Sequence, residues 1–260
     1  MLNKPLPVGN VINFSDCSSN SYYYDAVRWA SSSGVGIVLG KGDGTYNPEG
    51  SISEQDMMVF LYRLACYCEY SENTTAAQNS YINILKNSSL KYRDNFLDYA
   101  KAAVGWGYNK GFINDVNIIP TNNCLRGNTA LYLHNFYKIF QKKYGLSIVN
   151  TSGMNYVAPC GIGMKNLFSR SGTVISNSLT DITKTEFSNA MQNTFKNAKP
   201  LDICYLYCAS HGNSTGLALF KGSNAFLTPE YLRSQIDLYK GTFAVFISGC
   251  HSGTYISNNT

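Results

Sequence analysis

The spacing of apolar residues changes character near the middle of the chain. Up to about residue 145, apolar side chains recur every three or four positions, the period of a helix packed on a core. One helix is expected to begin after the N-cap Ser53, with its buried face made by Met57, Phe60, Leu61 and Leu64. Another is expected at 129–144, with its buried face made by Leu131, Phe136, Ile139 and Phe140 and with Tyr132 beside it. Segment 71–90 is rich in Asn and Ser and is predicted to be a loop.

Beyond about residue 150 the pattern becomes one of alternating helices and short apolar strands, which predicts an α/β layer. Thr183 and Glu186 have the spacing of a capping box at the start of a helix. The run 203–209 is almost entirely apolar or aromatic, which is typical of a parallel strand covered on both faces. A further helix is expected to begin at Thr228, and a second apolar strand follows at 243–247. We place the boundary between the two domains at 147/148.

The helical half contains two related segments, at about 10–70 and 90–145. Each has an aromatic-x-Asp opening, a first helix with a tryptophan, a glycine turn, a loop with a proline and a second helix. The corresponding residues are Phe14 and Tyr92, Asp16 and Asp94, Trp29 and Trp106, and Pro48 and Pro120. The tryptophans are the only two in the chain, and we expect them to pack between the helices of their own segment.

This order of motifs resembles the S-layer homology repeat, a bacterial module that forms small helical bundles. The resemblance implies binding of cell-wall polysaccharide through the arginine of a T-R-A-E motif. Glu54 stands at that position in the first segment, whereas the second segment keeps Arg126, which is therefore the candidate polysaccharide-binding residue. The fold expected for residues 10–147 is a mainly α bundle of two degenerate repeats.

The two apolar strands of the second half each run into a reactive residue next to glycine. The first ends at Ser210-His211-Gly212, and the second ends at Ser248-Gly249-Cys250. Because neighbouring parallel strands bring their carboxyl ends to one edge of a sheet, we expect His211 and Cys250 to lie at the same crevice. An imidazole can remove the proton of a thiol, which then attacks a carbonyl carbon. His251 is the alternative base, but adjacent side chains on an extended backbone point apart, which favours His211.

These strand ends resemble the caspase, legumain, gingipain and clostripain group of cysteine peptidases, in which one apolar strand ends in H-G and a later one in C-x-S-G or C-x-G. The resemblance implies that His211 is the base and Cys250 the nucleophile, with the N–H groups of Gly212 and Cys250 as the oxyanion hole. It implies a caspase-like α/β domain at 148–260, a parallel-rich sheet flanked by helices. The family's later strands, which build its specificity pocket, are not in this sequence, so the expected domain is incomplete at its C-terminal side.

Composition narrows the classes of function. The net charge is +5, but Lys and Arg form no cluster, which argues against a nucleic-acid-binding surface. The eight cysteines lack the paired spacing of zinc sites and are expected to be mostly reduced, so neither a metal nor a cofactor is predicted. The sequence contains no apolar run long enough to cross a membrane and no visible signal peptide. We therefore expect a cytoplasmic protein, or a surface or extracellular one if a leader was removed.

Two functions remain open from the sequence. The first is a cysteine endopeptidase that cleaves a protein or peptide substrate and carries a helical targeting or interaction module. The second is a non-catalytic wall-binding or interaction protein with a vestigial caspase-like domain.

Overall fold

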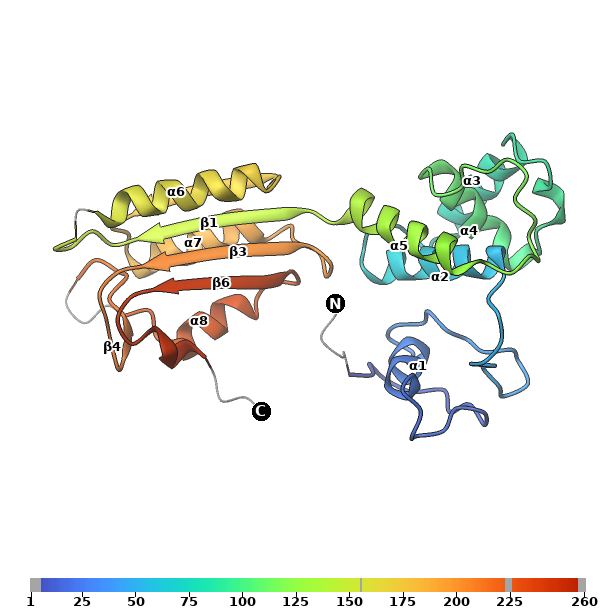
Figure 1. The fold of residues 1–260 in the computed structure, drawn as a ribbon, viewed down its shortest axis with the longest axis horizontal. Helices are drawn as coiled ribbons and strands as arrows, with labels where there is room; N and C mark the ends of the chain where they lie inside the picture. Colours follow the sequence, from blue (N-terminus) through green and yellow to red (C-terminus); the bar gives the residue numbers. More distant parts are fainter. Residues whose placement is uncertain (1–5, 155, 223–225, 257–260) are drawn as a thin grey trace. The chain divides into compact units, whose positions relative to one another are not determined.

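The protein is described by a computed structural model that covers residues 6–154, 156–222 and 226–256 (Figure 1). The chain divides into two compact units, and the division falls between Phe140 and Gln141. Each unit is described separately below.

The first unit is helical (Figure 1). Its elements are α1 (Tyr24–Ser31), α2 (Glu54–Tyr67), α3 (Thr75–Lys86), the 3-10 turn η1 (Arg93–Asn95), α4 (Asp98–Asn109) and α5 (Arg126–Phe140). Ser53 caps α2 by accepting a hydrogen bond from the Asp56 N–H, as predicted. The pairs α1–α2 and α4–α5 reproduce the repeated order of a first helix, a long loop and a second helix.

The two tryptophans occupy equivalent places in these pairs. Trp29 of α1 packs edge-on against Tyr67, the last residue of α2, with 5.6 Å between ring centroids. Trp106 of α4 is fully buried and stacks on Phe140, the last residue of α5. Each tryptophan therefore joins the first helix of its pair to the end of the second, which confirms the predicted core role.

Segment 71–90, predicted to be a loop, contains the helix α3, so that prediction was wrong. Thr74 caps α3 through its hydroxyl, and only Leu85 of the helix is fully buried. The high content of polar residues reflects this mostly solvent-exposed face. Gly105 of α4 explains how α3 packs closely, because a β-carbon there would lie 2.7 Å from the backbone carbonyl carbon of Tyr81.

The buried face of α5 also differs from the expected one. Tyr132, Phe136 and Phe140 are buried, whereas Leu131 and Ile139 are 51% and 43% exposed. A spacing of four residues keeps the buried set on a single stripe of the helix. The predicted set was wider than the surface that α5 buries.

The second unit is built on a four-stranded sheet (Figure 1). Its strands lie in the order β2-β1-β3-β6, and every neighbouring pair is parallel. The strands are β1 (Lys143–Val149), β2 (Ile175–Thr180), β3 (Ile203–Ala209) and β6 (Thr242–Ser248). The helices are α6 (Val157–Arg170), α7 (Lys184–Phe195) and α8 (Pro229–Ile236), with a short hairpin of β4 (Gly212–Asn213) and β5 (Gly216–Leu217) and a 3-10 turn η2 (Ser252–Tyr255).

Helices cover both faces of the sheet. On one face, Phe168 of α6 stacks on Tyr205 of β3. On the other, Phe187, Met191 and Phe195 of α7 join the alternate strand residues and Leu232 of α8 in one core. The capping box of Thr183 and Glu186 and the N-cap Thr228 are both present as predicted. Parallel strands with helices on both faces confirm the α/β architecture.

The domain boundary lies earlier than predicted. Residues 143–147 were assigned to the helical domain, but β1 begins at Lys143 and occupies an inner position in the sheet. Tyr144 continues the four-residue spacing of Tyr132, Phe136 and Phe140, so the helical pattern extends in sequence past the point where the helix ends. The apolar run 217–220 also predicts a short strand, but only Leu217 of that run lies in one, because β5 covers Gly216–Leu217.

Candidate functional site

The ends of β3 and β6 bring the two predicted catalytic residues to the same edge of the sheet. Ala209 pairs with Ser248 in the parallel register, and the Ser210 N–H donates to the Ser248 carbonyl at 3.2 Å. His211 follows β3 and Cys250 follows β6, both beyond the carboxyl ends. This edge is where open α/β sheets bind ligands.

Two glycines allow these strand ends to touch. A β-carbon on Gly212 would lie 3.1 Å from the carbonyl carbon of Cys250 and closer still to its oxygen. A β-carbon on Gly249 would lie 2.6 Å from the carbonyl oxygen of Ser210. Each glycine therefore faces the backbone of the other strand end, and larger residues would force the two segments apart.

The backbone of His211 is held by the segment after β5. Its carbonyl accepts from the Ala218 N–H at 2.7 Å, and the Ser210 hydroxyl donates to the Ala218 carbonyl at 2.7 Å. The buried Asn150, which follows β1, donates through Nδ2 to the same carbonyl at 3.1 Å. The imidazole Nε2 of His211 lies 3.6 Å from the place that a β-carbon of Gly153 would take. Elements after β1, β3 and β5 thus converge on this histidine.

Cys250 differs from the thiols inside the sheet. Burial raises the pKa of Cys204 to about 12 and also raises that of Cys208, which keeps both thiols protonated. Cys250 is exposed, as is His211. Within the described residues no hydrogen bond joins the His211 imidazole to the Cys250 thiol. The fold therefore brings the two residues to one edge, while their side chains stay unlinked.

The pairing of β4 with β5 determines where the N–H group of Gly212, a predicted oxyanion donor, points. The Leu217 N–H donates to the Leu227 carbonyl at 3.0 Å and to the Tyr255 hydroxyl at 2.8 Å, and the Leu217 carbonyl accepts from the Leu227 N–H at 2.7 Å. Gly212 is opposite Leu217 in the β4–β5 pair, so this is a non-hydrogen-bonded position. The N–H of Gly212 consequently points away from β5.

The backbone of His251 is not extended. We expected an extended backbone when we set His251 aside as the base, so that assumption was wrong. Its φ is +58°, in the left-handed region, and its carbonyl accepts from the N–H and hydroxyl of Thr254. A residue other than glycine in this region carries strain that the turn into η2 must offset. The preference for His211 therefore rests on its place after β3.

A polar cavity of about 420 Å³ adjoins His211, between the ends of β1 and β3. Its lining includes Thr151, Asp181 and Lys221, which sequence reasoning missed. Hydrogen bonds from the Thr151 hydroxyl and N–H, each 2.6 Å, lower the pKa of Asp181. The order β2-β1-β3 places this cavity at the switch point of the sheet, where ligands bind in doubly wound folds. The sequence could have indicated this cavity only if residues 143–149 had been recognised as a strand.

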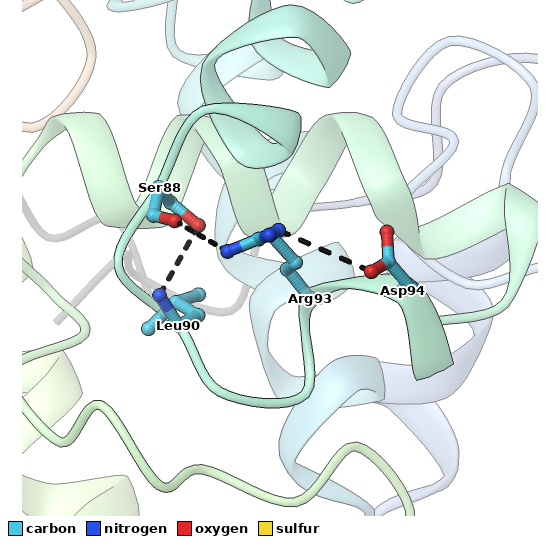
Figure 2. Close-up of polar contacts among 4 residues, drawn as sticks. All are labelled: Ser88, Leu90, Arg93 and Asp94. Atoms are coloured by element: carbon cyan, nitrogen blue, oxygen red, sulfur yellow. Dashed lines mark hydrogen bonds and ion pairs between the residues drawn. The ribbon is translucent and has the colours of Figure 1, made fainter.

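In the first unit, the aspartate of the aromatic-x-Asp opening is placed differently in the two segments. The carboxylate of Asp16 accepts from the N–H groups of Tyr46 and Asn47, at 2.9 and 2.6 Å, and closes the loop before α2. These bonds lower the pKa of Asp16, the Tyr46 bond most of all. Among the described residues, none donates a hydrogen bond to the carboxylate of the equivalent Asp94. Asp94 lies beside Arg93 (Figure 2). The Arg93 Nε and Asp94 Oδ2 atoms are 4.0 Å apart, and Arg93 donates a hydrogen bond to the Ser88 carbonyl.

Glu54 and Arg126 occupy the same structural position but contrasting surroundings. Each is the first residue of the second helix of its pair, α2 and α5. Glu54 is buried, and its carboxylate accepts from Asn128 Nδ2 at 2.9 Å and from the Tyr132 hydroxyl at 3.0 Å. Arg126 is exposed. Glu54 therefore connects α2 to α5, and Arg126 is the residue left on the surface.

The Asp16 loop closure and the capped start of α2 lie in one recognisable segment. Residues 13–58 match the S-layer homology domain. S-layer homology domains bind cell-wall polysaccharides, so the match indicates binding to, or anchoring at, the cell wall. The matched S-layer homology segment contains α1 and begins α2.

No curated protein and no solved structure gives a match to the chain. In the described ranges, no helix combines the length and the apolar character needed to cross a membrane. Those same ranges hold no group of three or more His, Cys, Asp or Glu side chains placed to bind a metal ion.

Proposed function

We propose that the second unit hydrolyses peptide bonds through Cys250 and His211, and that the first unit attaches the protein to cell-wall polysaccharide. The observation that carries the catalytic part is the contact of Gly212 with the Cys250 backbone at the carboxyl ends of β3 and β6. It brings a thiol, an imidazole and an N–H group to one edge of the sheet, beside a polar cavity.

In the proposed reaction His211 accepts the thiol proton of Cys250, and the thiolate attacks the carbonyl carbon of the scissile peptide bond. The N–H groups of Gly212 and Cys250 stabilise the resulting oxyanion. When the C–N bond breaks, His211 returns its proton to the leaving amine. Water then attacks the thioester, with His211 taking its proton, and releases the acid and the free thiol.

In this proposal, substrate binding orders the dyad, whose two residues are exposed in the free protein. Catalytic hydrogen bonds are often long or absent before substrate binds. The cavity beside His211 is the proposed site for a substrate side chain, where Asp181 and Lys221 present both signs of charge.

Site-directed variants of the chain test the catalytic proposal. Cys250→Ala and His211→Ala are expected to abolish cleavage of a peptide library and labelling by a peptidyl acyloxymethyl ketone. Cys160→Ala and His134→Ala are the matched controls, because both residues are exposed and distant from β3 and β6 in the sequence. Unchanged cleavage in the Cys250 or His211 variant would contradict the proposal.

The second candidate is a non-catalytic wall-binding protein. It is favoured by the S-layer homology match together with the missing hydrogen bond between His211 and Cys250. Sedimentation with purified wall polysaccharide tests attachment in both candidates. Arg126→Ala is expected to weaken it, whereas Arg170→Ala, an exposed arginine of the second unit, is expected to leave it unchanged. Attachment without any cleavage or labelling would favour the non-catalytic candidate.

A further inference from the structure

Asp181, the first residue after β2, holds an uncommon backbone conformation beside the end of β1. Its φ is +53°, in the left-handed region that residues other than glycine rarely adopt and that Asp and Asn tolerate best. Its N–H donates to the carbonyl of Val149, the last residue of β1, at 2.9 Å. Such conformations cluster at functional sites, where the surrounding bonds hold them in place.

The carboxylate of Asp181 binds Thr151 through both of its oxygens. Oδ1 accepts from the Thr151 N–H and Oδ2 accepts from the Thr151 hydroxyl, each at 2.6 Å. Hydrogen bonds to an ionised carboxylate are among the short and strong ones in proteins. The backbone and the side chain of Asp181 therefore bind the residues on either side of Asn150, where the chain leaves β1.

The turn that follows Thr151 lies beside the imidazole of His211. The Met154 N–H donates to the Thr151 carbonyl at 2.7 Å and closes the turn, in which Gly153 has a φ of +74°. A β-carbon on Gly153 would lie 3.6 Å from His211 Nε2. One α-hydrogen of Gly153 points in that direction, so the edge of the ring faces the backbone of the turn. The turn 151–153 therefore limits how the exposed imidazole can rotate.

The ends of this loop are anchored without Asp181. Asn150 is buried and donates to the Ala218 carbonyl at 3.1 Å. Met154 belongs to a small buried core, whose members are Val149, Met154, Val157 and Ala209. Loss of the Asp181 carboxylate is therefore expected to release the middle of the turn rather than to unfold the second unit.

We propose that Asp181 is a positioning residue for His211, which it orients by holding Thr151 and so keeping the turn 151–153 against the imidazole. This inference rests on the proposed peptidase function and adds a residue that acts on the base through the turn. The side chain acts by its hydrogen bonds rather than by its charge. An asparagine tolerates the same backbone, its oxygen accepts from the Thr151 N–H, and its amide group donates to the Thr151 hydroxyl.

Alanine and asparagine variants separate positioning from charge. Asp181→Ala removes both bonds to Thr151. We expect kcat for a quenched fluorescent peptide to fall about tenfold or more, since a misplacement of ~1 Å in a reacting group can lower a rate about 10²-fold. Asp181→Asn is expected to recover most of that loss. Equal changes of KM in both variants would instead mean that the charge binds substrate, and would overturn the proposal.

Glu186→Ala is the control for a loss of stability alone. Glu186 is also a carboxylate bound to a threonine, because it completes the capping box of α7 with Thr183. Its removal weakens the start of α7 but leaves the turn beside His211 in place, so kcat is expected to stay unchanged.

Thr151→Val and Thr151→Ser carry the test if Asp181→Ala does not fold. Valine removes the hydroxyl bond to Asp181 and keeps the backbone one, so kcat is expected to fall by less than in Asp181→Ala. Serine restores the hydroxyl and is expected to recover the loss. No loss in a folded Thr151→Val protein would then overturn the proposal.

A nuclear Overhauser effect between the His211 ring and the α-hydrogens of Gly153 tests the placement without hydrolysis. The signal is expected in the wild-type, Asp181→Asn and Glu186→Ala proteins and is expected to be lost in Asp181→Ala, with circular dichroism checking that each is folded. A wild-type chain that shows the signal but cleaves no peptide would count against the proposed peptidase function, and the signal alone then decides the role of Asp181. A folded Asp181→Ala protein that keeps the signal, or that keeps kcat in an active chain, would overturn the proposal.

Discussion

The contact between Gly212 and Cys250 gives the sharpest test of the catalytic proposal. A methyl group on Gly212 would point at the backbone carbonyl of Cys250, 3.1 Å from its carbon and nearer still to its oxygen. Ordinary contacts of a β-carbon begin at 3.4 Å. Because the obstacle is backbone rather than a flexible side chain, Gly212→Ala must push the ends of β3 and β6 apart.

The expected loss of activity follows from that displacement. The two segments must separate by about 1 Å, and a misplacement of ~1 Å in a reacting group can lower a rate about 10²-fold. We expect kcat/KM for peptide cleavage to fall about 10²-fold, which corresponds to ~2.7 kcal/mol of transition-state stabilisation. Alkylation of the exposed Cys250 by iodoacetamide needs no dyad geometry and is expected to change little.

Gly253→Ala is the matched control, because nothing lies within 4 Å of the position of its added methyl group. The assays are hydrolysis of a quenched fluorescent peptide and mass spectrometry of the labelled thiol. Near-ultraviolet circular dichroism reports whether the second unit remains packed. Full activity in a folded Gly212→Ala protein, or an equal loss in Gly253→Ala, would refute the reasoning.

Three other predictions concern stability and thiol chemistry. Gly105→Ala is expected to destabilise the first unit by about 1–3 kcal/mol, because the added methyl group pushes α3 away from α4. This cost outweighs the better helix propensity of alanine, which is expected to make the unobstructed Gly127→Ala neutral or slightly stabilising. Urea unfolding followed by tryptophan fluorescence compares the two variants. The lowered pKa of Asp16 stabilises the first unit above the unfolded-state pKa and loses this contribution as pH falls through the folded-state value, so Asp16→Asn should weaken the acid dependence of the same transition. Maleimide labelling at pH 8 should modify the exposed Cys160 quickly and Cys204 only after unfolding, because burial raises the pKa of Cys204 to about 12.

The sequence predicted the elements whose signals are local. The N-caps Ser53 and Thr228 and the capping box at Thr183 depend on residues within one turn, and all three are present. The parallel pairing of β3 with β6 was also predicted, because two fully apolar strands joined through a helix have few other arrangements.

The errors arose where local pattern and tertiary packing disagree. β1 begins at Lys143, and its second residue, Tyr144, continues the four-residue spacing of the preceding helix, so the pattern could not show where the helix ends. α3 buries little of its surface, and its polar composition therefore resembled that of a loop.

The residues of the candidate site were likewise predicted only in part. The places of His211 and Cys250 followed from the strand ends, whereas Asp181 and Asn150 required the position of β1. The side-chain geometry of a dyad depends on rotamers and bound substrate, which no sequence pattern specifies.

The burial of Glu54 has a consequence for how strongly the protein can hold to a polymer. Its carboxylate is engaged by Asn128 and Tyr132, so only Arg126 of the two equivalent positions faces solvent. Of these two helix starts, one would contact wall polysaccharide directly, and the other would act only by holding α2 against α5. A change at Arg126 would then weaken attachment directly, whereas a change at Glu54 would first disturb the packing of the two helices.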